Sequence, residues 1–234
     1  MPRRHFYSGF TLIELLAVIA IIAVLGSLVI VGVGKARASA RQSGCNSNLR
    51  QIGVGILLYA QEHGGRLPGP LRTTFGPYPK NSDKEVLGYF LSGYMSGYEV
   101  PNAGTLRRVD VFACPAWDAE IPREAQLANN GDGRAYSLNL KAYLSSSTSP
   151  TNLLAPFGYP AQAGKPETEA KPVKTLEIVN PATTWAITDL DAVLSPSYLS
   201  QAYTPKQPVH GNVRMTLFFD GHVTSKPVSE FAVN

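Results

Sequence analysis

Residues Phe10 to Gly34 form an almost unbroken apolar run near the N-terminus, and Glu14 is the one charged residue within it. A helix of this length spans roughly 37 Å, which is enough to cross the hydrocarbon core of a bilayer with some tilt. The run therefore predicts a membrane-spanning helix. A carboxylate inside such a helix is costly and usually marks a functional contact, so we expect a cationic group to meet Glu14.

Residues 35–63 predict an amphipathic helix that continues from the apolar run. Its apolar residues recur at intervals of four, three, four and three, which places them on one face. They are Cys45, Leu49, Ile52, Ile56 and Tyr59. This face is expected to pack on a globular domain. The glycines of the segment weaken helix formation, and His63-Gly64-Gly65 supplies a stop signal.

The remaining residues, 64–234, predict a globular head that contains both helix and sheet. Ser82-Asp83-Lys84-Glu85 is typical of a capping box and predicts a short helix that begins near Val86. The β-branched and aromatic content of Val109–Ala113 and Thr184–Thr188 predicts two strands.

The clearest strand pair lies near the C-terminus. Alternating apolar residues in Val213–Phe219 predict one strand, and His222–Ser225 predicts its partner. Asp220-Gly221 between them suits a type I′ turn, in which both central residues need positive φ. The first strand is expected to turn one face to the core, formed by Val213, Met215, Leu217 and Phe219. Together these patterns predict an α+β fold in which a long N-terminal helix packs on a small antiparallel sheet.

Composition agrees with one membrane helix followed by one loop-rich domain. The chain of 234 residues is 44% hydrophobic and only 16% charged, and its 18 prolines and 21 glycines favour many turns. The formal net charge is +4, and Arg3 and Arg4 lie ahead of the apolar run. The basic residues form no extended cluster outside the flanks of this run, so no nucleic-acid partner is expected.

The segment Gly9-Phe10-Thr11-Leu12-Ile13-Glu14 resembles the cleavage and methylation signal of type IV pilins and type II secretion pseudopilins. The resemblance implies that prepilin peptidase cuts between Gly9 and Phe10 and so removes residues 1–9 as a basic leader. It also implies that the new amino group of Phe10 is N-methylated. The transmembrane helix, residues 10–34, stays on the protein, whereas an ordinary secretory signal loses its apolar core. The amine of Phe10 is then expected to pair with Glu14 of an adjacent subunit.

The resemblance also implies a location and partners. It places the leader in the cytoplasm, so the head lies outside the cytoplasmic membrane on a single-pass anchor and can be drawn into a periplasmic or surface filament. The positive-inside rule favours the opposite orientation, because more cations follow the run than precede it. Those that follow are Lys35, Arg37, Arg41 and Arg50. Large C-terminal domains, however, translocate largely regardless of charge. The implied partners are prepilin peptidase, other pilin or pseudopilin subunits, an inner-membrane assembly platform and the lipid bilayer.

A second resemblance lies toward the C-terminus. His210 and Asp220-Gly221 are separated by nine residues, as in prepilin-type proteins with an H-X9-DG signature. The segments CNSNLRQIGVGILLYAQEHG and FACPAW are also similar to that group. The resemblance thus touches the stem, the middle and the end of the chain, and it implies a pilin-like fold.

Four residues near this signature are candidates for metal binding or acid–base chemistry. They are His210, Asp220, Asp189 and Asp191. Structural roles are favoured, because Asp220 suits its turn and the other two aspartates end a predicted strand. Asn129–Gly133 is similar to part of a calcium loop but lacks the later glutamate of an EF-hand. Some pseudopilins bind calcium in the head, so calcium is kept as an alternative. No other cofactor and no catalytic residue is expected.

Cys45 and Cys114 are the two cysteines of the chain. In a domain outside the cytoplasm they can form a disulfide, and closing about 70 residues would stabilise the fold by roughly 4 kcal/mol in the chain-entropy model. The alternative is a pair of buried free thiols. A catalytic thiol is not expected, because neither cysteine has a base motif nearby.

We therefore interpret the sequence as a structural subunit of a type II secretion pseudopilus or a type IV pilus-like filament, and not as an enzyme. Two alternatives are kept. One is an unpolymerised, single-pass membrane-anchored binding protein outside the cytoplasm. The other is a metal-binding enzyme that uses His210 and Asp220.

Overall fold

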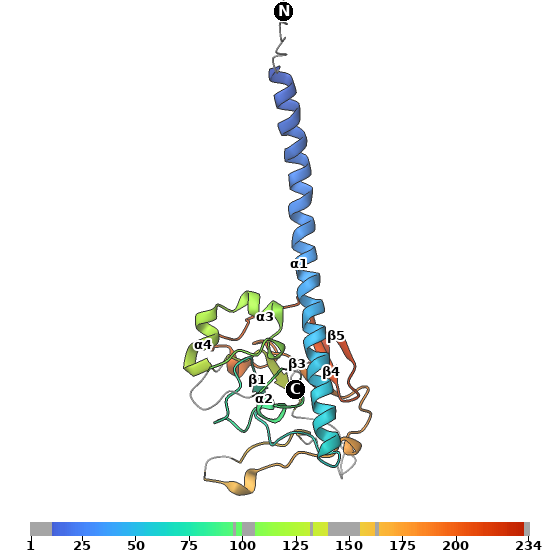
Figure 1. Ribbon diagram of the computed structural model, residues 1–234, viewed down its shortest axis with the longest axis vertical. Helices are drawn as coiled ribbons and strands as arrows, with labels where there is room; N and C mark the ends of the chain where they lie inside the picture. The colour runs from blue at the N-terminus through green and yellow to red at the C-terminus, as the bar shows by residue number, and fades with distance from the viewer. Residues whose placement is uncertain are drawn as a thin grey trace, which may run out of the picture. The chain divides into compact units, whose positions relative to one another are not determined.

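The computed structural model describes residues 11–95, 97–99, 106–131, 133–139, 155–161 and 164–231 (Figure 1). Residues 1–40 and 41–234 form two compact units. The 51-residue helix α1, Leu12–Glu62, begins in the first unit and ends in the second. Gly9 and Phe10, the residues of the expected cleavage site, lie outside the described residues.

The first unit consists, where described, of the apolar half of α1. None of its described side chains is buried, and Leu12, Ile13 and Ile22 are 80, 74 and 61% exposed. Helix α1 is long and apolar enough to cross a membrane. A helix that is apolar on all sides is stable when lipid or other apolar helices surround it, because water cannot solvate those side chains favourably.

The second unit is an α+β head, which confirms the fold class predicted from the sequence. Where the head is described, five strands form one antiparallel sheet in the order β1-β2-β3-β4-β5. They are β1 Thr74–Phe75, β2 Tyr136–Leu138, β3 Trp185–Asp189, β4 Val213–Phe218 and β5 Val223–Pro227. The short α-helices are α2 Leu87–Phe90, α3 Pro115–Glu120 and α4 Arg123–Gly131. The 3₁₀ helices are η1 Asp110–Phe112, η2 Pro166–Thr168, η3 Thr175–Glu177, η4 Pro196–Tyr198 and η5 Val228–Phe231.

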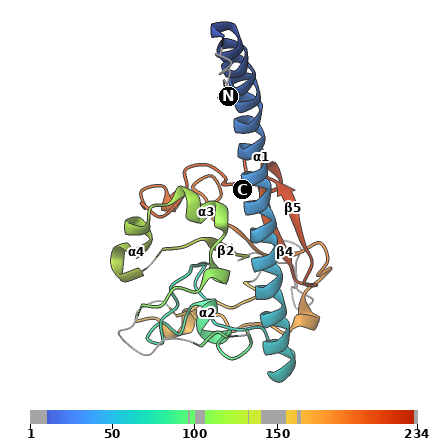
Figure 2. The ribbon, with the colours of Figure 1, turned by 45° about the horizontal axis from the view of Figure 1, so that its top comes forward.

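The last turns of α1 pack on the sheet beside β4 (Figure 2). Most of the apolar stripe predicted from the sequence is buried in this contact, at 0 to 4% exposure, namely Cys45, Leu49, Ile52 and Ile56. Each large aliphatic side chain buried in this way contributes about 1.5–3 kcal/mol. Gly53 allows the close approach, because a Cβ at this position would lie only 2.8 Å from Cδ1 of Leu217 on β4.

The strand predicted over residues 109–113 is wrong, because these residues form η1 and its flanks. Val109 N–H donates to the carbonyl of Pro77. The side-chain amide of Asn48 on α1 donates to the carbonyls of Asp110 and Ala113, at 3.3 and 2.8 Å. Since a helix side chain binds these carbonyls, the segment is attached to α1 and does not extend the sheet.

The short helix expected near Val86 is present as α2, but its predicted capping box is wrong. Val86 is the N-cap residue, and no side chain caps this helix. Asp83 instead accepts the backbone N–H of Glu85. Both carboxylates bind the guanidinium of Arg72, at 3.1 and 2.8 Å. The acidic residues therefore hold the segment that leads into β1.

Strands β4 and β5 form the predicted hairpin, but the turn differs from type I′. Gly221 has φ of 91°, whereas Asp220 does not have positive φ. Gly221 N–H donates to Phe218 O at 3.0 Å, and Phe218 N–H donates to His222 O at 2.9 Å. This is a three-residue loop in which a type I turn is followed by a left-handed glycine. Both faces of β4 are also covered, so burial is not confined to the face expected from alternation.

Replacing Gly53 with Val is expected to lower the free energy of unfolding by about 1–3 kcal/mol, because the new side chain must displace Leu217 in a filled core. Gly34→Val is the matched control, because a Cβ at Gly34 meets nothing within 4 Å. Thermal unfolding of the full-length protein in detergent, followed by near-ultraviolet circular dichroism, measures the difference. Equal melting temperatures for the two variants would contradict the close approach of α1 to β4.

Candidate functional site

The first candidate is the start of α1, where Thr11 and Glu14 cap the helix. The backbone N–H and the hydroxyl of Thr11 donate to Glu14 Oε2, at 2.8 and 2.7 Å. Glu14 N–H donates in return to the Thr11 hydroxyl oxygen at 3.4 Å, which completes a capping box. The Thr-x-x-Glu spacing is a sequence signal for this cap. The prediction from the sequence assigned Glu14 to a contact between subunits and did not identify this capping role.

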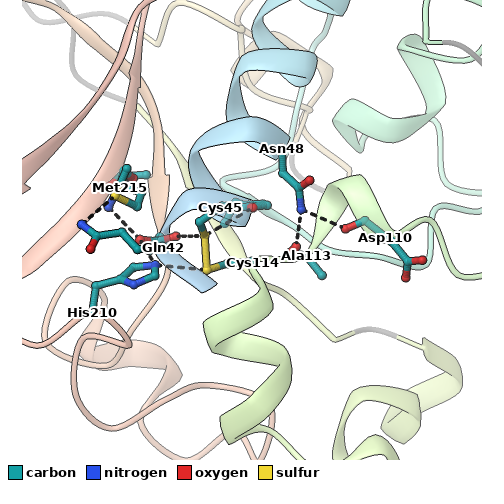
Figure 3. Close-up of a disulfide and its surroundings, with 11 residues drawn as sticks. Gln42, Cys45, Asn48, Asp110, Ala113, Cys114, His210 and Met215 are labelled. Carbon is teal, nitrogen blue, oxygen red and sulfur yellow. Dashed lines mark hydrogen bonds and ion pairs between the residues drawn. A yellow bond between two sulfur atoms is a disulfide. The ribbon is translucent and has the colours of Figure 1, made fainter. Parts of the chain in front are cut away.

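The second candidate lies in the head, where a disulfide joins α1 to α3 (Figure 3). Cys45 on α1 is bonded to Cys114, the N-cap residue of α3, and both are fully buried. Nε2 of His210 lies 3.2 Å from Cys114 Sγ, and Oδ1 of Asp189 lies 3.6 Å from Cys45 Sγ. The sequence left open a disulfide or two free thiols, and the structure contains the disulfide. It also brings a histidine and a carboxyl group to the sulfur atoms.

Burial dominates the electrostatics of this cluster. It raises the pKa of Asp189 to about 7, although the N–H of Met215, which donates to Asp189 Oδ2 at 2.8 Å, acts in the opposite direction. Burial also lowers the pKa of His210. Asp189 Oδ2 and His210 Nε2 are 3.6 Å apart. A neutral imidazole therefore lies beside a carboxyl group whose proton is retained to an unusually high pH.

His210 and Asp220 of the H-X9-DG pattern do not meet. They lie at opposite ends of β4, a six-residue strand that is roughly 20 Å long. Asp220 belongs to the β4–β5 turn, where it accepts the N–H of His222 and contacts its Nδ1 at 2.6 Å. Gly221 supplies the positive φ of that turn. The two ends of the motif therefore cannot form a single metal or catalytic site.

Asp191 forms a buried ion pair that the sequence did not predict. Nε and Nη2 of Arg214 bind its two carboxylate oxygens at 2.6 and 2.8 Å, and both side chains are 1% exposed. The N–H of Leu194 also donates to Asp191 Oδ1. Alternation along β4 had placed Arg214 on the outer face and gave no signal for its burial. Of the four metal candidates, only Asp189 and His210 therefore lie side by side.

The calcium-like segment Asn129–Gly133 coincides with the end of a helix. Asn129, Asn130 and Gly131 are the last residues of α4, a conformation unlike that of an EF-hand loop. Asp132 lies outside the described residues. Calcium binding at this segment stays a prediction from the sequence.

A cavity of about 540 Å³ lies between α1 and the segment that includes η1. Arg50, Arg107 and Arg108 contribute to its walls. Arg108 is bound to Asp110 and Asp118, at 2.6 and 2.8 Å. Within the part of the chain that the structure describes, Arg50 and Arg107 have no carboxylate within ion-pair distance. These two arginines favour an anionic ligand, although Asp110 also lines the cavity. The sequence pattern did not reveal the cavity, because its walls come from distant segments.

The prokaryotic N-terminal methylation motif matches residues 4–32 of the chain. No curated protein and no solved structure was found to match the chain. The matched residues include the expected cleavage site, the Glu14 cap and most of the apolar half of α1. The match supports a type IV pilin-like protein that is processed by prepilin peptidase and assembles with other pilin subunits, and it favours anchoring in a membrane.

The raised pKa of Asp189 predicts a pH dependence of stability in the oxidised, metal-free protein. The folded state keeps the Asp189 proton, so this stabilising contribution is present below about pH 4 and is lost as the pH rises through about 7. The isosteric change Asp189→Asn removes the titration. Between pH 4 and 7 the wild type should therefore lose up to about 4 kcal/mol relative to the variant, at about 1.4 kcal/mol for each pKa unit.

Unfolding of both proteins in the presence of a chelator, measured at half-unit pH intervals, tests this prediction. The contribution of His210 has the opposite sign, since its pKa is lowered, but it is common to both proteins and cancels in the difference to first order. Glu169→Gln, at an exposed position, is the control. Parallel curves for the wild type and Asp189→Asn would contradict the prediction.

Proposed function

We propose that this chain is a structural subunit of a filament, either a type IV pilus-like fibre or a type II secretion pseudopilus. One observation carries the proposal: the methylation motif at residues 4–32 coincides with the exposed apolar half of α1. A removable leader followed by a retained apolar helix suits a subunit that waits in a membrane and then enters a helical bundle.

Processing in this proposal occurs between Gly9 and Phe10. Prepilin peptidase removes residues 1–9, and the new amino group of Phe10 is methylated. Because α1 begins at Leu12, only Phe10 and Thr11 then precede the helix. The new amine is therefore separated from Glu14 by about one helical turn of sequence.

Glu14 has two roles in this proposal. Its Oε2 accepts both Thr11 donors and so stabilises the first turn of α1. Among the described residues, no donor contacts its Oε1, which can accept the Phe10 amine of an adjacent subunit. Such pairing offsets the cost of placing an ionised carboxylate among packed apolar helices.

Residues 10–34 span the cytoplasmic membrane in this proposal, with the leader inside and the head, residues 64–234, outside. Residues 35–63 link the two as the stem. The Cys45–Cys114 disulfide supports this orientation, because disulfides persist mainly in oxidising compartments. The filament then grows in the periplasm or at the surface, on an inner-membrane assembly platform. We propose no catalytic role, since His210 and Asp220 lie at opposite ends of β4.

The alternative is a membrane-anchored binding protein that does not polymerise, and the cavity of about 540 Å³ favours it. Arg50 and Arg107, which have no carboxylate within ion-pair distance among the described residues, would attract an anionic molecule to the head. The two functions differ at the N-terminus. A filament subunit must lose its leader, whereas a permanent anchor can keep it.

Mass spectrometry of N-terminal peptides from the native membrane tests processing. We expect a chain that begins at Phe10 and carries one added methyl group, because the matched motif spans this peptide bond. Gly9→Val, which alters the cleavage site alone, should keep residues 1–9 and serves as the control. A dominant wild-type species that keeps its leader would overturn the filament proposal and favour the permanent anchor.

Glu14→Gln separates the charge of Glu14 from its capping role, because glutamine also caps at this position. We expect normal processing but more than tenfold less protein in sheared filaments, since an unpaired buried charge costs about 3–5 kcal/mol. Thr11→Ala removes a capping hydroxyl, costs about 1 kcal/mol and keeps the charge, so incorporation should largely persist. Quantitative immunoblots of filament and membrane fractions measure both. Equal losses would assign Glu14 to the cap alone.

A further inference from the structure

We propose that Cys45, Cys114, His210 and Asp189 form a site that binds zinc once the disulfide between the two cysteines is reduced. One ligand atom from each of the four residues lies within 4.8 Å of the others. All four side chains are buried or nearly so, with His210 and Asp189 at 5 and 3% exposure. This ligand set differs from the one that the H-X9-DG pattern indicated, because neither Asp220 nor Asp191 belongs to it. It is also independent of the filament role.

The spacing of the ligand atoms fits tetrahedral coordination. In a tetrahedral zinc site the ligand atoms are separated by about 3.5 Å for sulfur to nitrogen, about 3.6 Å for sulfur to oxygen and about 3.4 Å for nitrogen to oxygen. The corresponding distances here are 3.2 Å from Cys114 Sγ to His210 Nε2 and 3.6 Å from Cys45 Sγ to Asp189 Oδ1. The other carboxylate oxygen, Asp189 Oδ2, lies 3.6 Å from His210 Nε2. Once the disulfide is reduced, the two sulfur atoms must separate to about 3.8 Å, which rotation of the cysteine side chains can supply.

The four ligands come from separate, well-anchored segments of the head. Cys45 lies within α1, Cys114 is the N-cap of α3, and Asp189 ends β3. His210 forms a bridge with Val213 at the start of β4. Its imidazole points toward the sulfur of Cys114 (Figure 3). Sites supported on secondary structure in this way keep their geometry when a metal enters.

The surroundings of Asp189 also suit a metal ligand. Its Oδ2 accepts the backbone N–H of Met215, which orients the carboxylate. Such outer hydrogen bonds fix the ligands of zinc sites and tune their affinity. Two sulfur atoms and an imidazole nitrogen favour zinc, whereas calcium and magnesium prefer sites made of oxygen atoms.

The reaction has two balanced steps. A dithiol transfers two electrons and two protons to the Cys45–Cys114 bond, which yields two thiols and an oxidised dithiol. Zn²⁺ then binds both cysteine sulfurs, a neutral imidazole nitrogen and an ionised carboxylate. The two thiol protons are released to solvent, together with the Asp189 proton wherever the carboxyl group still holds it. Zinc coordination thereby replaces the disulfide as the link between α1 and α3. A covalent bond fastens them in oxidising surroundings, and a metal fastens them in reducing ones.

Full-length protein in detergent tests the site in two states. One sample stays oxidised, and the other is reduced with a phosphine that is removed under argon. Both are incubated with Zn²⁺ and dialysed, and zinc is measured by plasma mass spectrometry while free thiols are counted. We expect one zinc ion per reduced chain and none per oxidised chain. The proposal would be overturned if the reduced protein held no zinc, or if the reduced and oxidised proteins held equal amounts of zinc per chain.

Cobalt substitution tests for sulfur ligands and for tetrahedral geometry in the wild-type protein, without any mutation. Co²⁺ added to the reduced wild type should give intense visible bands of tetrahedral cobalt and a near-ultraviolet sulfur-to-cobalt charge-transfer band. The oxidised protein should give neither. An octahedral spectrum, or one that lacks the charge-transfer band, would overturn the proposal even if every variant failed to fold.

Variants assign the two remaining ligands. His210→Ala and Asp189→Asn should each weaken Zn²⁺ binding to the reduced protein by about tenfold or more, since even changes around such ligands cost about 10–100-fold. His222→Ala is the control, because His222 lies in the β4–β5 turn. Near-ultraviolet circular dichroism checks the fold of each variant. Unchanged affinity in folded His210→Ala or Asp189→Asn would rule out the four-ligand site.

Discussion

The head depends on the close packing of α1 against its sheet. Four members of the helix stripe are buried there, and the missing side chain of Gly53 lets β4 approach. Most of the remaining core has to fit around this contact, because η1 is attached to the same helix through Asn48 and α3 through Cys45. The helix that carries the apolar segment is therefore also the central element of the head. The core of the head depends on the C-terminal part of this helix, whereas none of the described side chains of its apolar half is buried.

Burial of ionisable side chains in a small head has a desolvation cost, and the structure reduces this cost in two ways. Arg214 and Asp191 satisfy each other through two hydrogen bonds, a geometry that offsets much of the desolvation of both ions. Among the described residues, no arginine or lysine forms an ion pair with Asp189, although the charge of Arg214 lowers its pKa. Burial prevails, and the carboxyl group retains a proton to about pH 7. Groups buried without full compensation tend to be kept for specificity or function rather than for stability. This contrast singles out the Asp189 cluster.

The sequence predicted the elements whose signals are local and periodic. The three–four repeat from Cys45 to Ile56 predicted the buried face of α1. The alternation of residues 213–219 predicted the β4–β5 pair but not the burial of both faces of β4. Prediction failed where a distant group decides the local conformation. Residues 109–113 have strand propensity, but Asn48 binds two of their carbonyls. Arg214 is buried because Asp191, 23 residues earlier, reaches it. For the site, the sequence supplied the two cysteines and four metal candidates. It did not show that, of these four, His210 and Asp189 converge with the cysteines around one bond.

The Cys45–Cys114 bond closes the chain between them into a covalent ring that contains β1, α2 and η1. A protease that cuts one peptide bond within this ring opens it without releasing either piece, so the C-terminal strands stay tethered to the helix. The same bond changes how mechanical load is carried. A pull along α1 reaches α3 through a covalent linkage as well as through apolar contacts, so the head can be dragged by its helix without first peeling away from it.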